Sequence, residues 1–263
     1  MSAASLGTAL VTGASSGIGE VYADRLARRG HDLLLVARNA GRLSALAKRL
    51  TAETGRKVET LAADLAVPAD LARVEARLKT DAAITLLVNN AGLLSNGPVA
   101  EADPSALESM LSVNVTAVTR LAAVAAKAFV ERKHGAIVNV ASAMAFIDTP
   151  QTAAYAASKA YVLNFTLSLD LELKPQGVQV QAVLPGYTRT PMLGGGGHLP
   201  AEIVMDVEEL VDAALVGFDR HELVTIPSLP DAADYAAWTA TRQALRPNLS
   251  RDRAAPRYGV GGR

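Results

Sequence analysis

Short runs rich in leucine and β-branched residues alternate with longer segments whose apolar residues recur at helical spacing. This alternation restricts the possible folds more than any other feature of the sequence. The runs predicted to be strands are Thr8 to Thr12, Asp32 to Ala37, Lys57 to Ala62, Thr85 to Val88, Ala136 to Val140, Val178 to Leu184 and Leu223 to Ile226. The predicted helices are Gly17 to Arg29, Ala40 to Thr54, Pro68 to Lys79, Pro104 to Lys133, Thr152 to Leu173, roughly Ala201 to Phe218, and Ala232 to Arg246. Most strand runs are apolar throughout, so both faces of the sheet should be covered. The pattern predicts a doubly wound α/β fold, with a seven-stranded parallel sheet and helices on both faces.

No Pro/Gly/Ser-rich linker and no fixed-period repeat divides the 263 residues, which predicts a single domain over residues 1–263. Two segments lie outside the alternation. The glycine run Gly194 to Gly197 falls within a segment of about residues 190–207 that we expect to be a mobile substrate loop. The tail from about residue 247 to 263 is rich in Arg, Pro and Gly, and we expect it to be loosely held.

The composition excludes several classes of protein. Half of the residues are hydrophobic and 20% are charged, so disordered and fibrous classes are excluded. Lys+Arg and Asp+Glu both number 26, so no net charge attracts nucleic acid or an acidic membrane, and a small molecule is the expected partner. The sequence has no cysteine, which fits a reducing compartment. Met1 to Gly7 has no signal-peptide pattern, and no apolar run approaches about 18 residues without a polar break. We therefore expect a soluble, unprocessed, cytoplasmic chain with no nucleic-acid or membrane partner.

A glycine-rich turn joins the first predicted strand to the first predicted helix. Gly13 and Gly17 can adopt backbone angles closed to other residues, which lets main-chain N–H groups approach an anion. The helix N-terminus adds partial positive charge there, and Gly19 permits close packing of the helix on the sheet. At this position in the chain, the turn predicts a dinucleotide-binding site of the Rossmann type. Its cofactor-binding residues are Gly13, Ser15, Ser16, Gly17, Ile18 and Gly19.

The same turn also fits G-x-S-x-G, the nucleophile elbow of hydrolases, with Ser15 as the nucleophile. An elbow normally receives an oxyanion donor from a loop after an earlier strand, and too few residues precede Ser15 to form one. No metal-ligand spacing relates the four histidines, His31, His134, His198 and His221. The phosphate cradle is therefore the favoured interpretation, and no metal site is expected.

The end of the second predicted strand indicates which dinucleotide binds. An acidic residue there would select NAD, but the sequence has Ala37 followed by Arg38. A guanidinium can bind a 2′-phosphate through two parallel hydrogen bonds, which favours NADP(H) over NAD(H); the alternative is that Arg38 is a solvated loop cation. Asp64 and Leu65 follow the third strand, where they could meet the adenine, although a helix-capping role for Asp64 competes.

Tyr155 and Lys159 are four residues apart on a predicted helix, so their side chains share one face. At about 5 Å and an effective dielectric constant near 20, an ammonium favours a phenolate by roughly 3 kcal/mol, which is about two pKa units. We therefore expect the pKa of Tyr155 to be lowered, and Tyr155 is the candidate general acid. Ser142 lies just past the fifth strand and could polarise the same carbonyl oxygen. Asn114 interrupts an apolar run, where a role in holding a water would explain an amide.

Each of these residues alone has a purely structural explanation, but together they form an ordered set. Thr12-Gly13 with Gly17 and Gly19, Asn89 to Gly92, Asn114, Ser142, Tyr155 with Lys159, and Pro185-Gly186 follow one another in the order seen in short-chain dehydrogenases. Over about residues 5 to 192 the chain resembles the short-chain dehydrogenase/reductase family. The resemblance implies hydride transfer between NAD(P) and a carbonyl or alcohol.

The resemblance also assigns roles to the catalytic residues. Tyr155 would be the acid or base, Lys159 would also hold the nicotinamide ribose, Ser142 would orient the substrate oxygen, and Asn114 would anchor a water of the proton relay. Further cofactor contacts are implied for Asn90, Ala91, Gly92, Tyr155, Lys159, Pro185, Gly186, Thr188 and Thr190.

The expected activity is that of an NADP(H)-dependent carbonyl (keto) reductase for an apolar ketone or aldehyde. The predicted substrate-binding residues are Ser142, Met144, Tyr155, Tyr187 and Met192. Binding of a substrate carboxylate by Arg189 is an option that stays open. Small and apolar residues on the helices Pro104 to Lys133 and Thr152 to Leu173 predict a homo-oligomer, a tetramer or a dimer. Two alternatives stay open: a non-catalytic NADP-binding sensor or regulatory protein, and an NAD-linked alcohol dehydrogenase.

Overall fold

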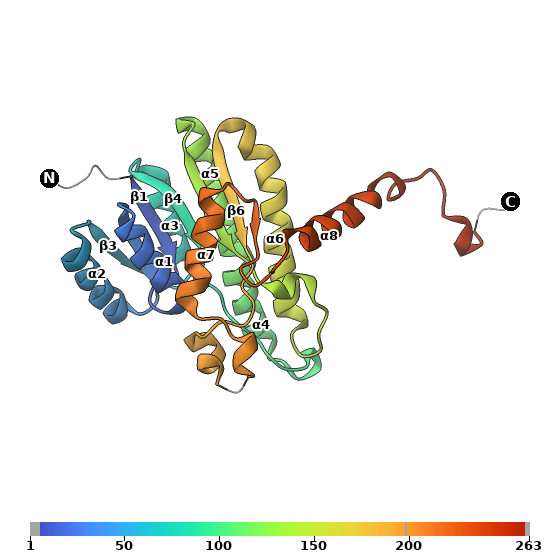
Figure 1. Cartoon of the computed structure of the whole chain (residues 1–263), viewed down its shortest axis with the longest axis horizontal. Helices are drawn as coiled ribbons and strands as arrows, with labels where there is room; N and C mark the ends of the chain where they lie inside the picture. The colour runs from blue at the N-terminus through green and yellow to red at the C-terminus, as the bar shows by residue number, and fades with distance from the viewer. Residues whose placement is uncertain (1–5, 198, 261–263) are drawn as a thin grey trace. The chain divides into compact units, whose positions relative to one another are not determined.

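The computed structural model describes residues 6–197 and 199–260. Seven strands form one sheet in the order β3-β2-β1-β4-β5-β6-β7, with every pair parallel (Figure 1). The strands are β1 Thr8–Thr12, β2 Asp32–Ala37, β3 Val58–Ala62, β4 Ile84–Asn89, β5 Gly135–Val140, β6 Val178–Val183 and β7 Val224–Thr225. The predicted doubly wound fold of Rossmann type is confirmed, and each predicted strand is present to within one or two residues at its ends.

Helices lie between consecutive strands along the chain, and one more helix follows the last strand. They are α1 Gly17–Arg28, α2 Ala40–Thr54, α3 Pro68–Thr80, α4 Pro104–Leu111, α5 Val118–Arg132, α6 Ala153–Leu173, α7 Val207–Asp219 and α8 Ala232–Ala244. Local sequence explains several ends: the side chain of Asn39 accepts a hydrogen bond from the Arg42 N–H at the start of α2, and Gly55 ends that helix in the left-handed conformation.

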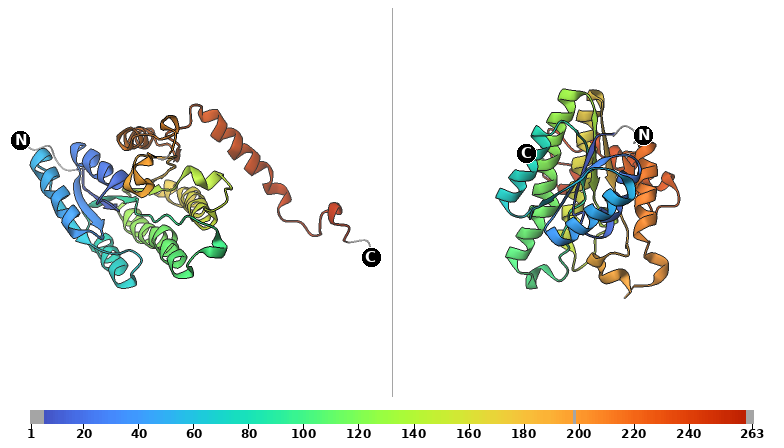
Figure 2. Two further views of the ribbon diagram at one scale, coloured as in Figure 1. Left: turned by 90° about the horizontal axis from the view of Figure 1, so that it is seen from below. Right: turned by 90° about the vertical axis from the view of Figure 1, so that its left-hand side faces the viewer.

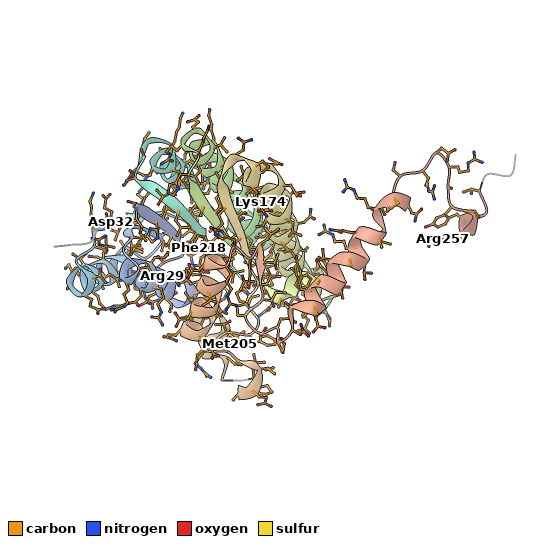
Figure 3. The ribbon with its side chains drawn as sticks, turned by 45° about the horizontal axis from the view of Figure 1, so that its top comes forward. Arg29, Asp32, Lys174, Met205, Phe218 and Arg257 are labelled. Atoms are coloured by element: carbon orange, nitrogen blue, oxygen red, sulfur yellow. The ribbon has the colours of Figure 1, made fainter. Side chains whose placement is uncertain are left out.

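Two predicted helices differ from the structure. The stretch from residue 104 to 132 is α4 and α5 joined by a π-helical turn, Ser112–Ala117. The single helix predicted from about Ala201 to Phe218 is instead a short 3₁₀ turn, Ala201–Ile203, followed by α7. The reason is that Met205 is drawn into an extended bridge with Thr188, in which its N–H donates to Tyr187 O at 3.0 Å. Figure 3 labels Met205 in the segment before α7.

The chain divides into two compact units, Met1–Pro227 and Ser228–Arg263. The first contains the whole sheet and is the unit in which the candidate site lies. The second contains α8, where Tyr235 and Trp238 stack with ring centroids 5.6 Å apart. The single domain and the loosely held tail stay predictions.

Two apolar layers enclose the sheet of the first unit, with α1, α2 and α7 on one face and α3, α5 and α6 on the other (Figure 2). Successive residues of a strand point to opposite faces, so Ala9 and Val11 of β1 join the first layer and Leu10 joins the second. This explains why the strand runs are apolar throughout rather than alternating.

The helical stretch Pro104–Arg132 is long and apolar enough to cross a membrane by length and composition. Half of its most apolar window is buried inside the fold, where Val118, Leu121, Ala122, Ala125 and Phe129 pack in the core. A core helix passes the same test of length and composition.

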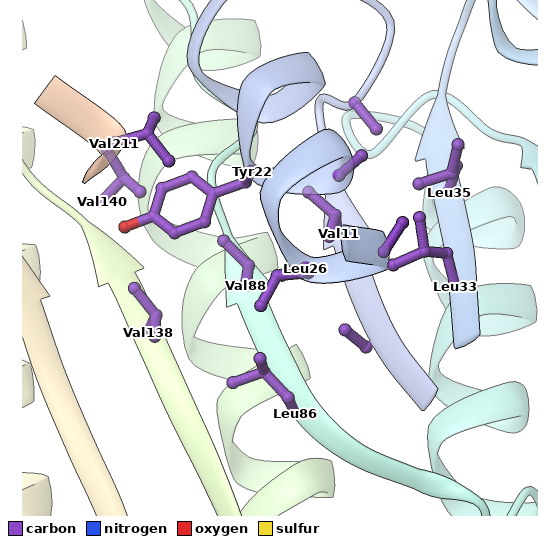
Figure 4. Close-up of a cluster of buried hydrophobic side chains, with 14 of the residues drawn as sticks. Val11, Tyr22, Leu26, Leu33, Leu35, Leu86, Val88, Val138, Val140 and Val211 are labelled. Atoms are coloured by element: carbon purple, nitrogen blue, oxygen red, sulfur yellow. The ribbon is translucent and has the colours of Figure 1, made fainter. Parts of the chain in front are cut away.

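Tyr22 of α1 is fully buried, with its ring beside Val140 and Val211 (Figure 4), and its hydroxyl has no hydrogen-bond partner among the described residues. Burial raises the pKa of this phenol, so the group is neutral.

A buried hydroxyl without a partner costs about 1 kcal/mol or more. We expect Tyr22→Phe to increase the free energy of unfolding by about 1 kcal/mol in urea titrations. A loss of stability would mean that the hydroxyl has a partner, such as a buried water.

Candidate active site

The glycine-rich turn lies where the strand order reverses, between the carboxyl ends of β1 and β4. Gly13 has φ +67°, and a Cβ on it would lie 2.8 Å from Asn90 Nδ2. A Cβ on Gly19 would collide with Asn90 Nδ2 and Gly13 O. Both positions therefore require glycine. Ser16 is the N-cap residue of α1 but makes no side-chain cap, so the first N–H groups of that helix are not covered by it. A cradle of this kind fits a pyrophosphate, as predicted.

Thr12, at the last position of β1, holds the turn against the loop after β4. Its Oγ1 accepts hydrogen bonds from the N–H groups of Asn90 and Ala91, both at 3.0 Å, and donates to Val88 O at 3.3 Å. In return, Asn90 Nδ2 donates to Thr12 O at 2.8 Å. The structure therefore uses Asn90 and Ala91 to fix the cradle. Adenosine contacts for Asn90, Ala91 and Gly92 stay predictions. Sequence reasoning assigned no role to the Thr12 side chain, although a hydroxyl at the end of a buried strand was the available signal.

Arg38 lies exposed directly after Ala37, the last residue of β2. Within the part of the chain that the structure describes, its guanidinium has no hydrogen bond or ion pair, so it is available for an anion. Asp64 accepts a hydrogen bond from Ala66 N at 3.0 Å in the turn before α3, but the N-cap residue of that helix is Val67, so the competing capping role is wrong and the adenine contact of Asp64 stays a prediction. Leu65 is buried, and its predicted contact with the adenine is untested.

Ser142 lies near the phenol of Tyr155, where a side-chain hydrogen-bond interaction lowers the pKa of the phenol, although burial raises it by more. Tyr155 belongs to the first turn of α6, and Ser142 follows β5, so the fold brings two distant segments together. Ser142 Oγ also accepts from Met144 N at 3.2 Å and donates to Pro185 O at 3.4 Å, which fixes its position. A substrate carbonyl oxygen placed between the two hydroxyls could accept a hydrogen bond from each.

Lys159 is buried one turn further along α6. Its Nζ donates to Val140 O at 3.0 Å and lies 5.8 Å from the centroid of the Tyr155 ring. Burial lowers the pKa of Lys159 to about 8.

The expected lowering of the Tyr155 pKa is wrong. Burial raises the pKa of this phenol, and the hydrogen bond with Ser142 lowers it by less. The reason is that the helical spacing predicted the closeness of the ammonium but not the desolvation of both groups. Lys159 directs its proton to a main-chain carbonyl and is itself costly to charge. The phenol therefore stays neutral, which suits a proton donor.

Asn114 projects from the π-helical turn and is buried. Its Oδ1 accepts from Leu93 N at 2.8 Å, and its Nδ2 donates to Leu93 O at 2.9 Å and to Ser158 Oγ at 3.1 Å. All of its amide protons are therefore used within the protein, and the side chain pins the loop after β4. The water-anchoring role stays a prediction. π-Helical turns often mark functional sites.

The loop after β6 completes the site. Thr188 Oγ1 donates to Gly186 O at 3.1 Å, and a Cβ on Gly17 would lie 3.3 Å from Thr190 Cβ, so this loop reaches the glycine-rich turn. Among the predicted substrate-binding residues, Tyr187 is 48% exposed and Met192 is 52% exposed. Met144 lies two residues after Ser142, in a 3₁₀ turn.

Arg189 does not point to a substrate carboxylate. Its Nε donates to Asp206 Oδ1 at 2.9 Å, and it lines a cavity of about 620 Å³ beside α1 and α7. Arg25 in the same cavity is paired with Asp24 and Asp212. This cavity contains none of the four predicted catalytic residues.

Comparison with known proteins agrees with this geometry. The family model of the short chain dehydrogenases matches residues 7–197. An uncharacterised oxidoreductase of Staphylococcus saprophyticus is 32% identical over 219 residues, which cover 83% of this chain and 93% of that protein. The very-long-chain 3-oxoacyl-CoA reductase-B of Danio rerio is 34% identical over 73% of this chain, and the match spans 63% of that longer protein.

Two similar proteins have solved structures. One is a short-chain dehydrogenase from Sphingobium yanoikuyae in complex with NADPH; it is 52% identical, with a TM-score of 0.93, 96% of this chain and 100% of that chain covered. The other is the bulky-bulky ketone specific alcohol dehydrogenase from Comamonas testosteroni, 46% identical with a TM-score of 0.91, over 97% of this chain and 99% of that chain.

Proposed function

The chain belongs to the short-chain dehydrogenase/reductase family, and from that premise we propose that it is an NADP(H)-dependent carbonyl reductase acting on bulky apolar ketones. The observation that carries the proposal is that Tyr155 has Lys159 Nζ 5.8 Å from its ring centroid and Ser142 near its phenol, after the carboxyl end of β5. The nicotinamide ring, when bound, supplies the hydride.

The protein's own residues supply the proton and the orientation. The neutral phenol of Tyr155 donates a proton to the substrate oxygen, while the hydroxyl of Ser142 turns from its long 3.4 Å bond with Pro185 O and donates to the same oxygen. Lys159, fixed by Val140 O, keeps a positive charge beside the phenol and stabilises the phenolate left after transfer. Gly13, Gly17 and the N-terminus of α1 would hold the pyrophosphate.

The proposed preference for NADP(H) rests on Arg38. The residue before it is Ala37, so no carboxylate at the end of β2 would repel a 2′-phosphate. The similar dehydrogenase from Sphingobium yanoikuyae was solved with NADPH, which supports the assignment.

We expect Arg38→Asp to reverse this preference. Losing a charge-assisted contact and adding a like charge should weaken NADPH binding by about 100-fold while NADH improves severalfold. Steady-state kinetics with both coenzymes measures the ratio. Lys48→Asp is the matched control because it makes the same change of charge at an exposed site further along α2. If Arg38→Asp left the ratio of kcat/KM for NADPH to that for NADH unchanged, Arg38 would be a solvated cation that does not contact the coenzyme.

The proposed substrate class rests on the apolar and aromatic residues predicted to line the substrate site, which are Met144, Ile147, Tyr187 and Met192. The last three are about half exposed, so their side chains are accessible to an apolar substituent. Two similar proteins act on related substrates by their names, the ketone-specific alcohol dehydrogenase of Comamonas testosteroni and the 3-oxoacyl-CoA reductase of Danio rerio.

The test is NADPH oxidation, followed by absorbance, with a panel of ketones that carry two small, one bulky or two bulky substituents. We expect the highest kcat/KM with two bulky apolar substituents. Coenzyme binding without turnover of any member would favour the alternative of an NADP-binding sensor. This alternative is kept because one relative, which is 33% identical over 193 residues, is named inactive hydroxysteroid dehydrogenase-like protein 1, from Homo sapiens.

We also propose that the chain is cytoplasmic and forms a homo-oligomer, a dimer or a tetramer. Tyr161 and Leu171 of α6 are exposed apolar residues on a helix predicted to meet a second copy. Sedimentation velocity measures the assembly.

A further inference from the structure

The hydroxyl of Ser158 lies between two groups of the site that come from different parts of the chain. Ser158 is 1% exposed and belongs to α6, directly before Lys159. Its Oγ donates to Tyr155 O at 2.7 Å and accepts from Asn114 Nδ2 at 3.1 Å. One buried hydroxyl therefore connects the π-helical turn to the first turn of the active-site helix.

The hydrogen bonds around Asn114 leave only one consistent orientation. Because its Oδ1 accepts from Leu93 N, its Nδ2 must carry the two protons that reach Leu93 O and Ser158 Oγ. Removing the Ser158 hydroxyl would leave one buried Nδ2 proton without an acceptor, which destabilises the folded state unless the amide moves. Movement of the amide would loosen its hold on Leu93.

Both ends of this chain of hydrogen bonds act on reacting groups. At one end, the loop after β4 packs between Asn114 and Lys159: a Cβ on Gly92 would lie 3.4 Å from Asn114 Oδ1 and 3.6 Å from Lys159 Nζ. At the other end, the bond from Ser158 to the Tyr155 carbonyl fixes the turn that carries the phenol. A side-chain bond back to a helix carbonyl bends the helix slightly and so sets the direction of that turn.

We propose that Ser158 is a positioning residue, which keeps the phenol of Tyr155 in register with Ser142 and Lys159 by connecting its helix turn to Asn114 and Leu93. This inference rests on the proposed function and deepens it. The role is indirect, because Ser158 reaches the reacting atoms only through the main chain of Tyr155 and the amide of Asn114. A misplacement of about 1 Å in a reacting group can cost on the order of 100-fold in rate.

The same helix contains a close structural copy of this arrangement away from the site. Thr166 is fully buried, and its Oγ1 donates to Val162 O at 2.6 Å and accepts from Asn139 Nδ2 at 3.0 Å. A hydroxyl of α6 again joins a helix carbonyl to a buried asparagine, but about three turns beyond Tyr155. Thr166→Val and Ser158→Ala therefore remove equivalent pairs of hydrogen bonds.

The experiment compares these two variants of the full chain. We expect both to lower the melting temperature by similar amounts, and only Ser158→Ala to reduce kcat, by about tenfold, and to shift the pH profile of kcat. The dissociation constant for NADPH, from fluorescence titration, should stay within twofold of wild type in both. In the coenzyme-free protein, Ser158→Ala alone should increase deuterium uptake in peptides covering residues 90–97, where Asn114 holds Leu93.

Ser158→Thr keeps a hydroxyl that can bond the same carbonyl, and we expect it to recover most of the lost kcat. Should Ser158→Ala not fold, Ser158→Cys takes its place, because a thiol is a weak donor and acceptor of similar size. Equal loss of kcat in the position-158 and Thr166 variants, or a wild-type pH profile in Ser158→Ala, would overturn the inference. If the wild-type protein reduces no ketone, the proposed function is wrong. The deuterium uptake of residues 90–97 then tests the role of Ser158 by itself, and unchanged uptake in Ser158→Ala would overturn the inference.

Discussion

Replacing Tyr155 by phenylalanine is expected to abolish ketone reduction while leaving coenzyme binding intact. The substitution removes only the phenolic oxygen, which lies near Ser142 and is the proposed proton donor. General acid catalysis is typically worth about 10²–10⁴ in rate, so kcat should fall by at least that range. The dissociation constant for NADPH should change less than twofold, because the pyrophosphate cradle and Arg38 belong to other segments. Single-turnover kinetics with NADPH and fluorescence titration measure the two quantities separately.

The same helix offers a control for the loss of a tyrosine hydroxyl. Tyr161 is 40% exposed, and its OH is hydrogen-bonded to Thr119 Oγ1 at 2.9 Å, away from the site. Tyr161→Phe should keep wild-type kcat. If Tyr155→Phe retained more than a tenth of the wild-type kcat, another group would be the acid, and the proposed mechanism would be wrong.

Periodicity and glycine chemistry were enough to predict the fold of the first unit. Leu33 to Val36 form an uninterrupted apolar run because β2 is covered on both faces, and its residues separate into the two layers of the core. Gly13 and Gly19 could be identified because a side chain at either position would collide with the loop after β4. Such requirements are local, and a single sequence records them directly.

The parts of the site that sequence reasoning missed depend on contacts between distant segments. Thr12 and Ser158 are ordinary residues in their own neighbourhoods, and their roles come from partners 44 to 79 positions away. The error over the Tyr155 pKa has the same origin, because the spacing to Lys159 is local whereas burial of the phenol depends on the tertiary fold. The π-helical turn at Asn114 likewise could not be predicted, since its residues have the periodicity of an ordinary helix.

Lys159→Met is expected to have opposite effects on activity and on stability. Turnover should fall by at least about 100-fold, because no cation would stabilise the phenolate left by proton transfer. Stability should rise at pH 7, since the buried ammonium is costly: a pKa lowered from 10.5 to about 8 corresponds to roughly 3 kcal/mol against the folded state. Losing the hydrogen bond to Val140 O offsets about 1 kcal/mol of that gain.

The pH dependence of this gain distinguishes charge burial from better packing. Between pH 8 and 10.5 the unfolded wild-type chain binds a proton at Lys159 that the folded chain has released, so wild-type stability from this group rises with pH across that window. Below pH 8 the whole cost is present, and the variant should be more stable by about 2 kcal/mol in urea titrations at pH 7. The difference should shrink toward zero, or reverse, by pH 10. If the variant were more stable by a constant amount from pH 7 to 10, the gain would come from packing of the methionine. If the variant were less stable than wild type at pH 7, burial of the ammonium would not be costly.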